Sequence, residues 1–159
     1  MEVFQERVQL PSDKVIDDFY RVVLPEFAVA VPRTEDGRFV LVRGYKHGLG
    51  RVTLSPPAGL LNTGETPLQA AQRELLEETG YVADDWRSLG KYVVDGNRQC
   101  GTMHVFSASG ARLISAPVED ETEALEIELL DRADVVKALA SGNFGTLAGA
   151  SAIALTLVL

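Results

Sequence analysis

One short helix with a crowded acidic face limits what this chain can fold into more than any other segment. The sequence RELLEETG, residues 73–80, places Glu74, Glu77 and Glu78 within five residues of one another. At the period of an α-helix these carboxylates share one face, an arc of roughly 100°. Like charges at such spacing cost a few tenths of a kcal/mol per pair, so a folded protein needs a reason to keep them together.

The ends of this helix are marked by the sequence itself. Thr66 can cap the N-terminus, Pro67 suits the first helical position and Gln69 completes a capping box. Gly80 supplies the C-terminal stop. The apolar side chains outside the acidic arc are expected to face the core: Leu68, Ala71, Leu75 and Leu76.

Two interpretations of the acidic face follow. Runs of charge on a helix are most often solvated. The alternative is a site for a hard divalent cation such as Mg²⁺, which prefers carboxylate oxygens and binds substrate phosphates alongside. The preceding loop favours the cation site, because Gly59 and Gly64 permit sharp turns or close approach to a ligand. Pro56 and Pro57 stiffen the entry to that loop.

The rest of the chain predicts an α+β protein, an α/β/α sandwich with a mixed sheet between helices. We find no repeat or linker and predict a single domain over residues 1–159. A loop is expected over residues 44–50. Asp131 is expected to cap a helix that runs to about Ala140, and a last helix follows Gly145. Strands are expected where β-formers or apolar runs are bounded by turn signals, at residues 3–10, 15–24, 27–31, 38–43, 51–54, 89–95, 102–109 and 125–130.

Charge and cysteine content exclude several classes of protein. The formal net charge is −8 and no basic face is visible, which argues against binding nucleic acid or an anionic membrane. Cys100 is the single cysteine, so no internal disulfide can form and a reducing compartment is expected. The first residues lack the pattern of a secretory leader, and we predict a cytoplasmic protein. The apolar run 147–159 is too short to span a bilayer.

The acidic helix and the loop before it match one known pattern at fixed spacing. The chain resembles the Nudix hydrolases, whose box is matched by Gly59, Glu65, Arg73, Glu74, Leu75, Glu77, Glu78, Gly80 and Tyr81. Within that family, the segments 36–59, 15–31 and 138–159 are similar to the ADP-ribose pyrophosphatase subgroup. The resemblance therefore covers most of the chain.

This resemblance implies a reaction and a metal. The reaction would be hydrolysis of the pyrophosphate bond in a nucleoside diphosphate linked to another group. The substrate that the resemblance implies most directly is ADP-ribose or a related ADP-sugar, whose hydrolysis gives AMP and a sugar phosphate. The implied cofactor is Mg²⁺, with Mn²⁺ as an alternative. The implied metal ligands are Glu74 and Glu78, with Glu77 close by, and the backbone carbonyl of Ala58.

The resemblance also implies roles for residues around the metal. Arg73 would orient the glutamates and Glu65 would brace the loop, while Gly59 and Gly80 would be structural. The general base is expected on an acidic loop predicted at residues 115–124. The candidates are Glu123 first and Glu121 second, and the alternative is that this loop is simply solvated. Glu78 is expected to be a catalytic residue as well as a metal ligand.

Other polar residues allow two interpretations each. Arg43 and Arg51 are candidates for contacting substrate phosphate or nucleotide, or they are solvated strand charges. Glu126 and Glu128 alternate with apolar residues and are expected on the wet face of a strand. His47 is a weaker candidate for substrate contact. His104 lies in a strand pattern and is expected to pack.

Two departures from the subgroup keep other functions open. Ser55 stands where the subgroup commonly has a Glu, and the loop 95–102 lacks the proline that is often present. A GDP-sugar or a dinucleoside compound is therefore an alternative substrate, and a non-catalytic ligand-sensing Nudix domain is an alternative function. The early strands, residues 3–24, resemble those that cross between subunits in the subgroup, which implies a homodimer.

Overall fold

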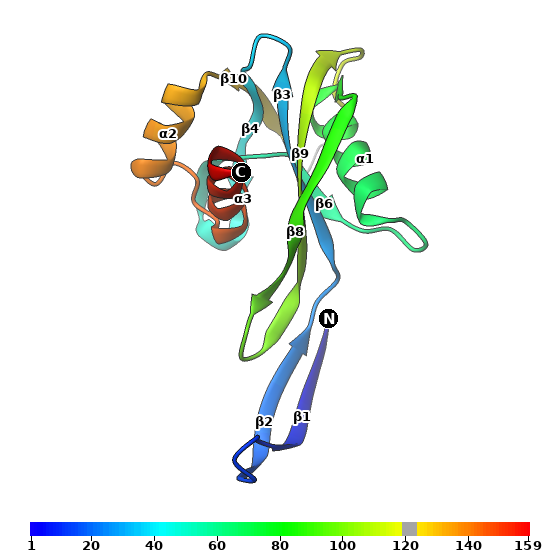
Figure 1. Ribbon diagram of the computed structural model, residues 1–159, viewed down its shortest axis with the longest axis vertical. Helices are drawn as coiled ribbons and strands as arrows, with labels where there is room; N and C mark the ends of the chain where they lie inside the picture. The colour runs from blue at the N-terminus through cyan, green and yellow to red at the C-terminus, as the bar shows by residue number, and fades with distance from the viewer. Residues whose placement is uncertain (119–123) are drawn as a thin grey trace.

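The protein was analysed as a computed structural model that describes residues 1–118 and 124–159. Within these residues, a ten-stranded mixed sheet forms the centre of the molecule, with three α-helices and one 3₁₀ turn around it (Figure 1). The elements in chain order are β1 (Glu2–Gln9), β2 (Val15–Val23), β3 (Phe27–Thr34), β4 (Phe39–Lys46), η1 (His47–Leu49), β5 (Arg51–Ser55), β6 (Ala58–Leu60), α1 (Pro67–Thr79), β7 (Tyr81–Val82), β8 (Asp85–Asp95), β9 (Gln99–Leu113), β10 (Leu125–Leu130), α2 (Arg132–Ala140) and α3 (Leu147–Val158).

The sheet is mixed because its two central strands run parallel while most of their neighbours are antiparallel. The main strand order is β1-β2-β9-β3-β4-β10, with β5 on β4, β6 on β3, and β7 and β8 on β9. β3 and β9 pair in parallel from Phe27 opposite Met103 to Thr34 opposite Ala111. Helix α1 covers one face of the sheet, and α2 and α3 cover the other (Figure 1). The predicted α/β/α sandwich is confirmed.

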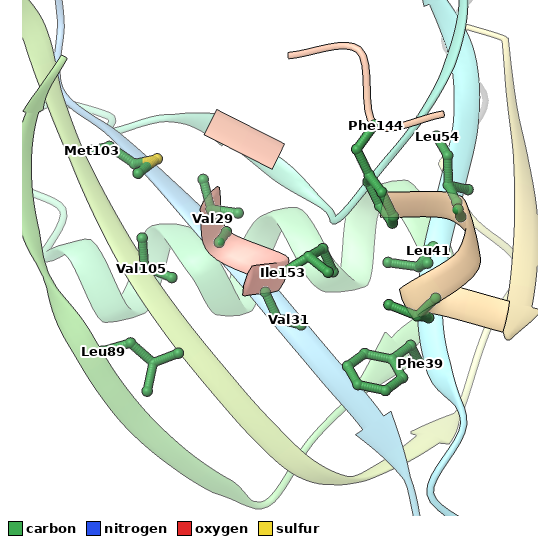
Figure 2. Packing of buried hydrophobic residues seen from close by; sticks show 13 residues of the cluster. Val29, Val31, Phe39, Leu41, Leu54, Leu89, Met103, Val105, Phe144 and Ile153 are labelled. Atoms are coloured by element: carbon green, nitrogen blue, oxygen red, sulfur yellow. The ribbon is translucent and has the colours of Figure 1, made fainter. Parts of the chain in front are cut away.

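β3 divides its side chains between two cores, as the two-residue period of a strand requires. Val29 and Val31 join the core under α2 and α3, where Ile153 packs beside them (Figure 2). Ala28 and Ala30 face α1 and pack with its residues, including Leu75. Alanines on this face let α1 lie close to the sheet, and that closeness determines the geometry described below.

All eight expected strands are present; the last has its predicted bounds, residues 125–130, and the bounds of the others differ from the prediction. The loop prediction for residues 44–50 was wrong at its start, because β4 continues through Tyr45 and Lys46 by pairing with β5. The loop before the acidic helix, expected at residues 55–65, likewise contains a short strand, β6. Its Ala58 pairs with Val29 of β3. Both extensions depend on a partner strand distant in sequence, which local propensity does not record.

β1 and β2 form an antiparallel hairpin that projects from the rest of the molecule (Figure 1). We call this hairpin the arm, residues 2–23. Arg21 pairs with Glu6 at 2.6 Å within the arm, and its Nη1 donates to Gln99 Oε1 of β9 at 3.0 Å. The register joins the arm to β9 at Val22 opposite Gln99.

The expected C-terminal helix is present as α3, and it packs on the core through Ala152 and Ile153. Within residues 1–118 and 124–159, no helix has both the length and the apolar character needed to cross a membrane.

Candidate active site

Helix α1 begins and ends where the sequence predicts. The Thr66 hydroxyl accepts a hydrogen bond from the backbone amide of Gln69, and the reciprocal bond closes the capping box. Gly80 ends the helix at φ 73°, a left-handed conformation that favours glycine. A Cβ at Gly80 would also overlap the backbone of Ser115. The helix is thus fixed at both ends in the orientation that presents its glutamates.

The face of α1 that is buried differs from the expected one. Ala71 and Leu75 are buried as predicted, but Leu68 is 37% exposed and Leu76 is only half-buried. The buried face of the helix lies closer to the acidic face than predicted, because Ala70 packs against the sheet. The acidic face is therefore only partly solvated, and the Glu74 side chain is 13% exposed.

Arg73 connects the glutamates to the loop before the helix. Its Nε donates to Glu65 Oε1 at 2.9 Å, and its Nη1 donates to Glu74 Oε1 at 2.7 Å and Glu77 Oε2 at 2.8 Å. Its Nη2 donates to the Leu60 carbonyl at 2.9 Å. The hydrogen bonds to these carboxylates raise the pKa of Arg73 above its ordinary value, and the bond to Glu65 contributes most. The expected Arg73–Glu77 pair is present as one part of this network.

Glu65 completes the bracing of the loop. Its Oε2 accepts from the backbone amide of Asn62 at 2.9 Å while the same carboxylate binds Arg73. The Arg73 guanidinium lowers the pKa of Glu65 below its ordinary value, so Glu65 stays ionised at neutral pH.

Glu74 lies directly against Gly59. A Cβ built at Gly59 would overlap the Glu74 carboxylate, so only glycine leaves room for this side chain. Burial raises the pKa of Glu74 above its ordinary value, and the Arg73 guanidinium opposes that rise. A carboxylate held in a partly dry position beside backbone is chemically suited to a cation.

Glu78 faces the other end of the same loop. The backbone amide of Ala58 donates to Glu78 Oε2 at 3.2 Å, which brings strand β6 and helix α1 together. A cavity of about 80 Å³ opens beside these two residues. Its lining comes from five parts of the chain: Val29, Lys46, Ser55, Pro56, Ala58, Glu78, Thr146, Ala148 and Gly149.

The comparisons with known proteins agree with this geometry. The NUDIX domain family matches residues 24–148. The chain belongs to the Nudix family. An ADP-ribose pyrophosphatase from Bacillus subtilis is 31% identical over 143 residues, which cover 89% of this chain and 76% of that protein.

Two further comparisons bear on the family assignment. A CMP-5'-(N-acetyl-N-hydroxy-3-aminopropyl)phosphonate hydrolase from Streptomyces rubellomurinus is 30% identical over 96% of this chain and 72% of its own. A crystal structure of an ADP compounds hydrolase superposes with a TM-score of 0.79 at 24% identity, covering 99% of this chain and 90% of the other. The latter shows the fold. With its family and relatives, this chain is a Nudix pyrophosphohydrolase.

The carboxylates of the Nudix box fit a divalent cation by their chemistry. Glu74 and Glu78 are one helical turn apart and both lie against the β6 backbone. In the part of the chain that the structure describes, no three acidic, histidine or cysteine side chains converge as a complete metal site. Glu77 is turned to Arg73 and is 46% exposed, so it is less enclosed than Glu74.

The structure does not bring the two candidate arginines to the cavity. Arg43 of β4 is bound by two hydrogen bonds to Glu128 of β10. Arg51 of β5 reaches the carbonyl of Gly142 at 3.3 Å. The basic residue that lines the cavity is Lys46, which the sequence placed in a loop with no role, because the extension of β4 is not visible locally.

The remaining polar residues singled out by the sequence lie in different surroundings. Glu121 and Glu123 lie outside the described residues. His47 is exposed in η1. His104 is buried in β9, as expected, with its Nε2 at 2.6 Å from Glu26 Oε2. Glu126 is exposed as predicted, whereas Glu128 is half-buried because Arg43 binds it.

Proposed function

We propose that this Nudix pyrophosphohydrolase cleaves the pyrophosphate bond of ADP-ribose or a related ADP-sugar, releasing AMP and a sugar phosphate. The observation that carries the proposal is the contact of Glu74 and Glu78 with the β6 backbone beside a cavity lined by Lys46. The names of relatives along most of the chain support the ADP-linked substrate.

Each box residue has a proposed task. Glu74 and Glu78 hold Mg²⁺, or Mn²⁺ in its place, with Glu77 and the carbonyl of Ala58 completing the site. The cation, when bound, supplies positive charge to the substrate phosphates and lowers the pKa of a bound water. Arg73 keeps the carboxylates oriented through its hydrogen bonds to Glu74 and Glu77.

Substrate binding must overcome the charge of the protein. The net charge of −8 repels a diphosphate, so local positive charge is needed where the phosphates lie. Lys46 supplies it at the cavity. Arg43 and Arg51 remain candidates for contacting substrate phosphate or nucleotide, although neither is among the described residues that line that cavity.

A carboxylate is the proposed acceptor for the proton of the attacking water. Glu123 is the first choice and Glu121 the second; both lie outside the described residues, in the acidic stretch of sequence before β10. Exchange of each for Gln separates them, because the true base loses turnover while the other variant retains it.

We also propose that the protein acts in the cytoplasm as a homodimer joined through the arm. A two-stranded hairpin is marginally stable alone in water. The arm exposes several large apolar side chains that a second copy would cover: Val3, Phe4, Val15 and Tyr20. Light scattering should return twice the 17.2 kDa of one chain, and a monomeric mass contradicts this part of the proposal.

A substrate panel tests the function directly. The purified chain is given ADP-ribose, ADP-glucose, GDP-mannose, a CMP-linked phosphonate, a diadenosine polyphosphate and dGTP, each with Mg²⁺ and with EDTA. Release of AMP from ADP-ribose in Mg²⁺, abolished by EDTA, is the expected result. Activity on another member only would keep the chemistry and reassign the substrate.

The second candidate function is ligand sensing without turnover. A folded protein that binds Mg²⁺ but hydrolyses no member of the panel would favour it. The full set of box glutamates and the network around Arg73 favour catalysis, because sensing domains of this family usually lose box glutamates and this chain keeps all of them.

A further inference from the structure

A buried threonine outside the cavity ties one wall of the cavity to the sheet. Thr53 of β5 is 1% exposed. Its hydroxyl donates to the Asn143 carbonyl at 2.8 Å and accepts from the Gly145 amide at 2.7 Å. Both partners lie in the short connection between α2 and α3, so one buried side chain hydrogen-bonds two backbone groups of that connection.

Other contacts hold the same connection, residues 142–145. The Leu54 amide donates to the Asn143 carbonyl at 3.1 Å, and Arg51 Nη2 donates to the Gly142 carbonyl at 3.3 Å. Phe144 is buried in the core with Leu54 and Leu41 (Figure 2). Gly145 has no room for a side chain, since a Cβ would lie 2.9 Å from Thr53 Oγ1.

The connection leads directly into the cavity. Thr146 caps α3 by accepting from the Gly149 amide at 3.1 Å, and both residues line the cavity with Lys46 and Glu78. A Cβ at Gly149 would lie 3.4 Å from Pro56 Cδ, which shows how closely α3 approaches the loop before the Nudix box. The position of this wall therefore depends on where residues 142–145 hold the start of α3.

We infer that Thr53 is a positioning residue for substrate binding, acting through Gly145 and Thr146 on the α3 wall of the cavity. The inference rests on the proposed function, because the cavity is taken as part of the substrate site. Thr53 lines no part of the cavity and contacts none of the box glutamates. Its loss should weaken substrate binding and leave the chemical step unchanged.

Two variants isolate the hydroxyl. Thr53→Val keeps the shape and removes both hydrogen bonds, whereas Thr53→Ser keeps the hydroxyl and removes a methyl group. Thr102→Val is the control, because Thr102 is a buried threonine of β9 in a different part of the sheet. We expect KM for ADP-ribose to rise about tenfold in Thr53→Val with kcat within about twofold. Thr53→Ser and Thr102→Val should keep the wild-type KM.

A structural readout accompanies the kinetics. Amide hydrogen exchange over residues 142–150 should accelerate in Thr53→Val and stay slow in Thr53→Ser. An unchanged KM in Thr53→Val, or a fall in kcat at constant KM, would overturn the inference, since the latter indicates only loss of folded enzyme. If Thr53→Val does not fold, amide hydrogen exchange of the wild-type protein provides the test. A rapidly exchanging Gly145 amide would show that the Thr53 hydroxyl does not hold the connection, whereas a slow one would support the inference.

Failure of the proposed function is distinguishable from failure of this inference. A wild-type chain that turns over no substrate would remove the function, while the exchange experiment would still report whether Thr53 restrains the start of α3.

Discussion

At the residue scale, the close approach of Gly59 and Glu74 decides the character of the site. The absent side chain of Gly59 makes space for a carboxylate that would otherwise have to point into solvent. Burial then raises the pKa of Glu74, while Arg73 opposes the rise. A single glycine thus allows a carboxylate of the acidic helix face to lie partly enclosed against the β6 backbone.

Gly59→Ala should separate this contact from general stability. The added Cβ overlaps the Glu74 carboxylate, so the carboxylate must move and kcat/KM should fall on the order of 10²-fold or more. Gly96→Ala is the matched control, because nothing lies within 4 Å of a Cβ there. Steady-state kinetics on ADP-ribose with thermal unfolding checks both variants, and equal activity in the two would contradict the assigned contact.

Glu78→Gln should abolish turnover while the fold stays intact. The amide cannot supply the negative charge proposed to hold the cation, and kcat should fall on the order of 10³-fold or more. Glu35→Gln, in an exposed hairpin turn, controls for loss of one charge. Near-wild-type kcat in Glu78→Gln, measured at saturating Mg²⁺, would defeat the metal-site assignment.

At the element scale, α1 acts as a rigid carrier whose ends are both fixed. The capping box holds its first turn, and Gly80 ends it under the backbone of Ser115. The loop before it is tied to the middle of the helix by Arg73, which binds Glu65 and the Leu60 carbonyl. Loop and helix therefore form one unit, and a change at either end is expected to reach the glutamates.

Thr66→Ala should destabilise this unit by about 1 kcal/mol, because the Gln69 amide loses its capping partner. Chemical denaturation measures the change in free energy of unfolding. Thr63→Ala, in the exposed loop just before the cap, should change it by less than about 0.5 kcal/mol. A Thr66→Ala protein as stable as Thr63→Ala would show that the cap contributes nothing measurable.

At the scale of the whole molecule, the arm and the body meet near a small charged cluster. Glu26 follows the arm, and its carboxylate lies 2.6 Å from His104 and 3.5 Å from Lys91. The hydrogen bond with His104 is the main cause that lowers the pKa of Glu26. This cluster connects the chain leaving the arm to the two long strands β8 and β9.

The lowered pKa of Glu26 has a definite sign for stability. Its stabilisation is complete above the unfolded pKa of about 4.3 and is lost as pH falls through the lower folded value. Because the Glu26 side chain is 43% exposed, Glu26→Gln should cost only ~0.2–1 kcal/mol at pH 7. Denaturation at pH 7 and pH 3 checks this, and a difference that does not shrink at pH 3 would contradict the assignment.

The sequence by itself determined the local parts of this protein. The capped helix over 67–79 and the helix that Asp131 caps are both present as predicted. Each depends on neighbours within a few residues, and such signals are readable from propensity and capping. The spacing of the box residues was equally local, since it only requires one helix and the loop before it.

Only the tertiary structure decided what surrounds the box. Lys46 joins the cavity because β5 extends β4, and Thr146 joins it because Thr53 holds the connection before α3. The burial of Glu74 depends on how closely α1 lies on the sheet, which the helical period alone misjudged at Leu68. These features depend on pairing and packing between residues far apart in the chain. The free energy of such contacts cannot be seen in any local sequence pattern.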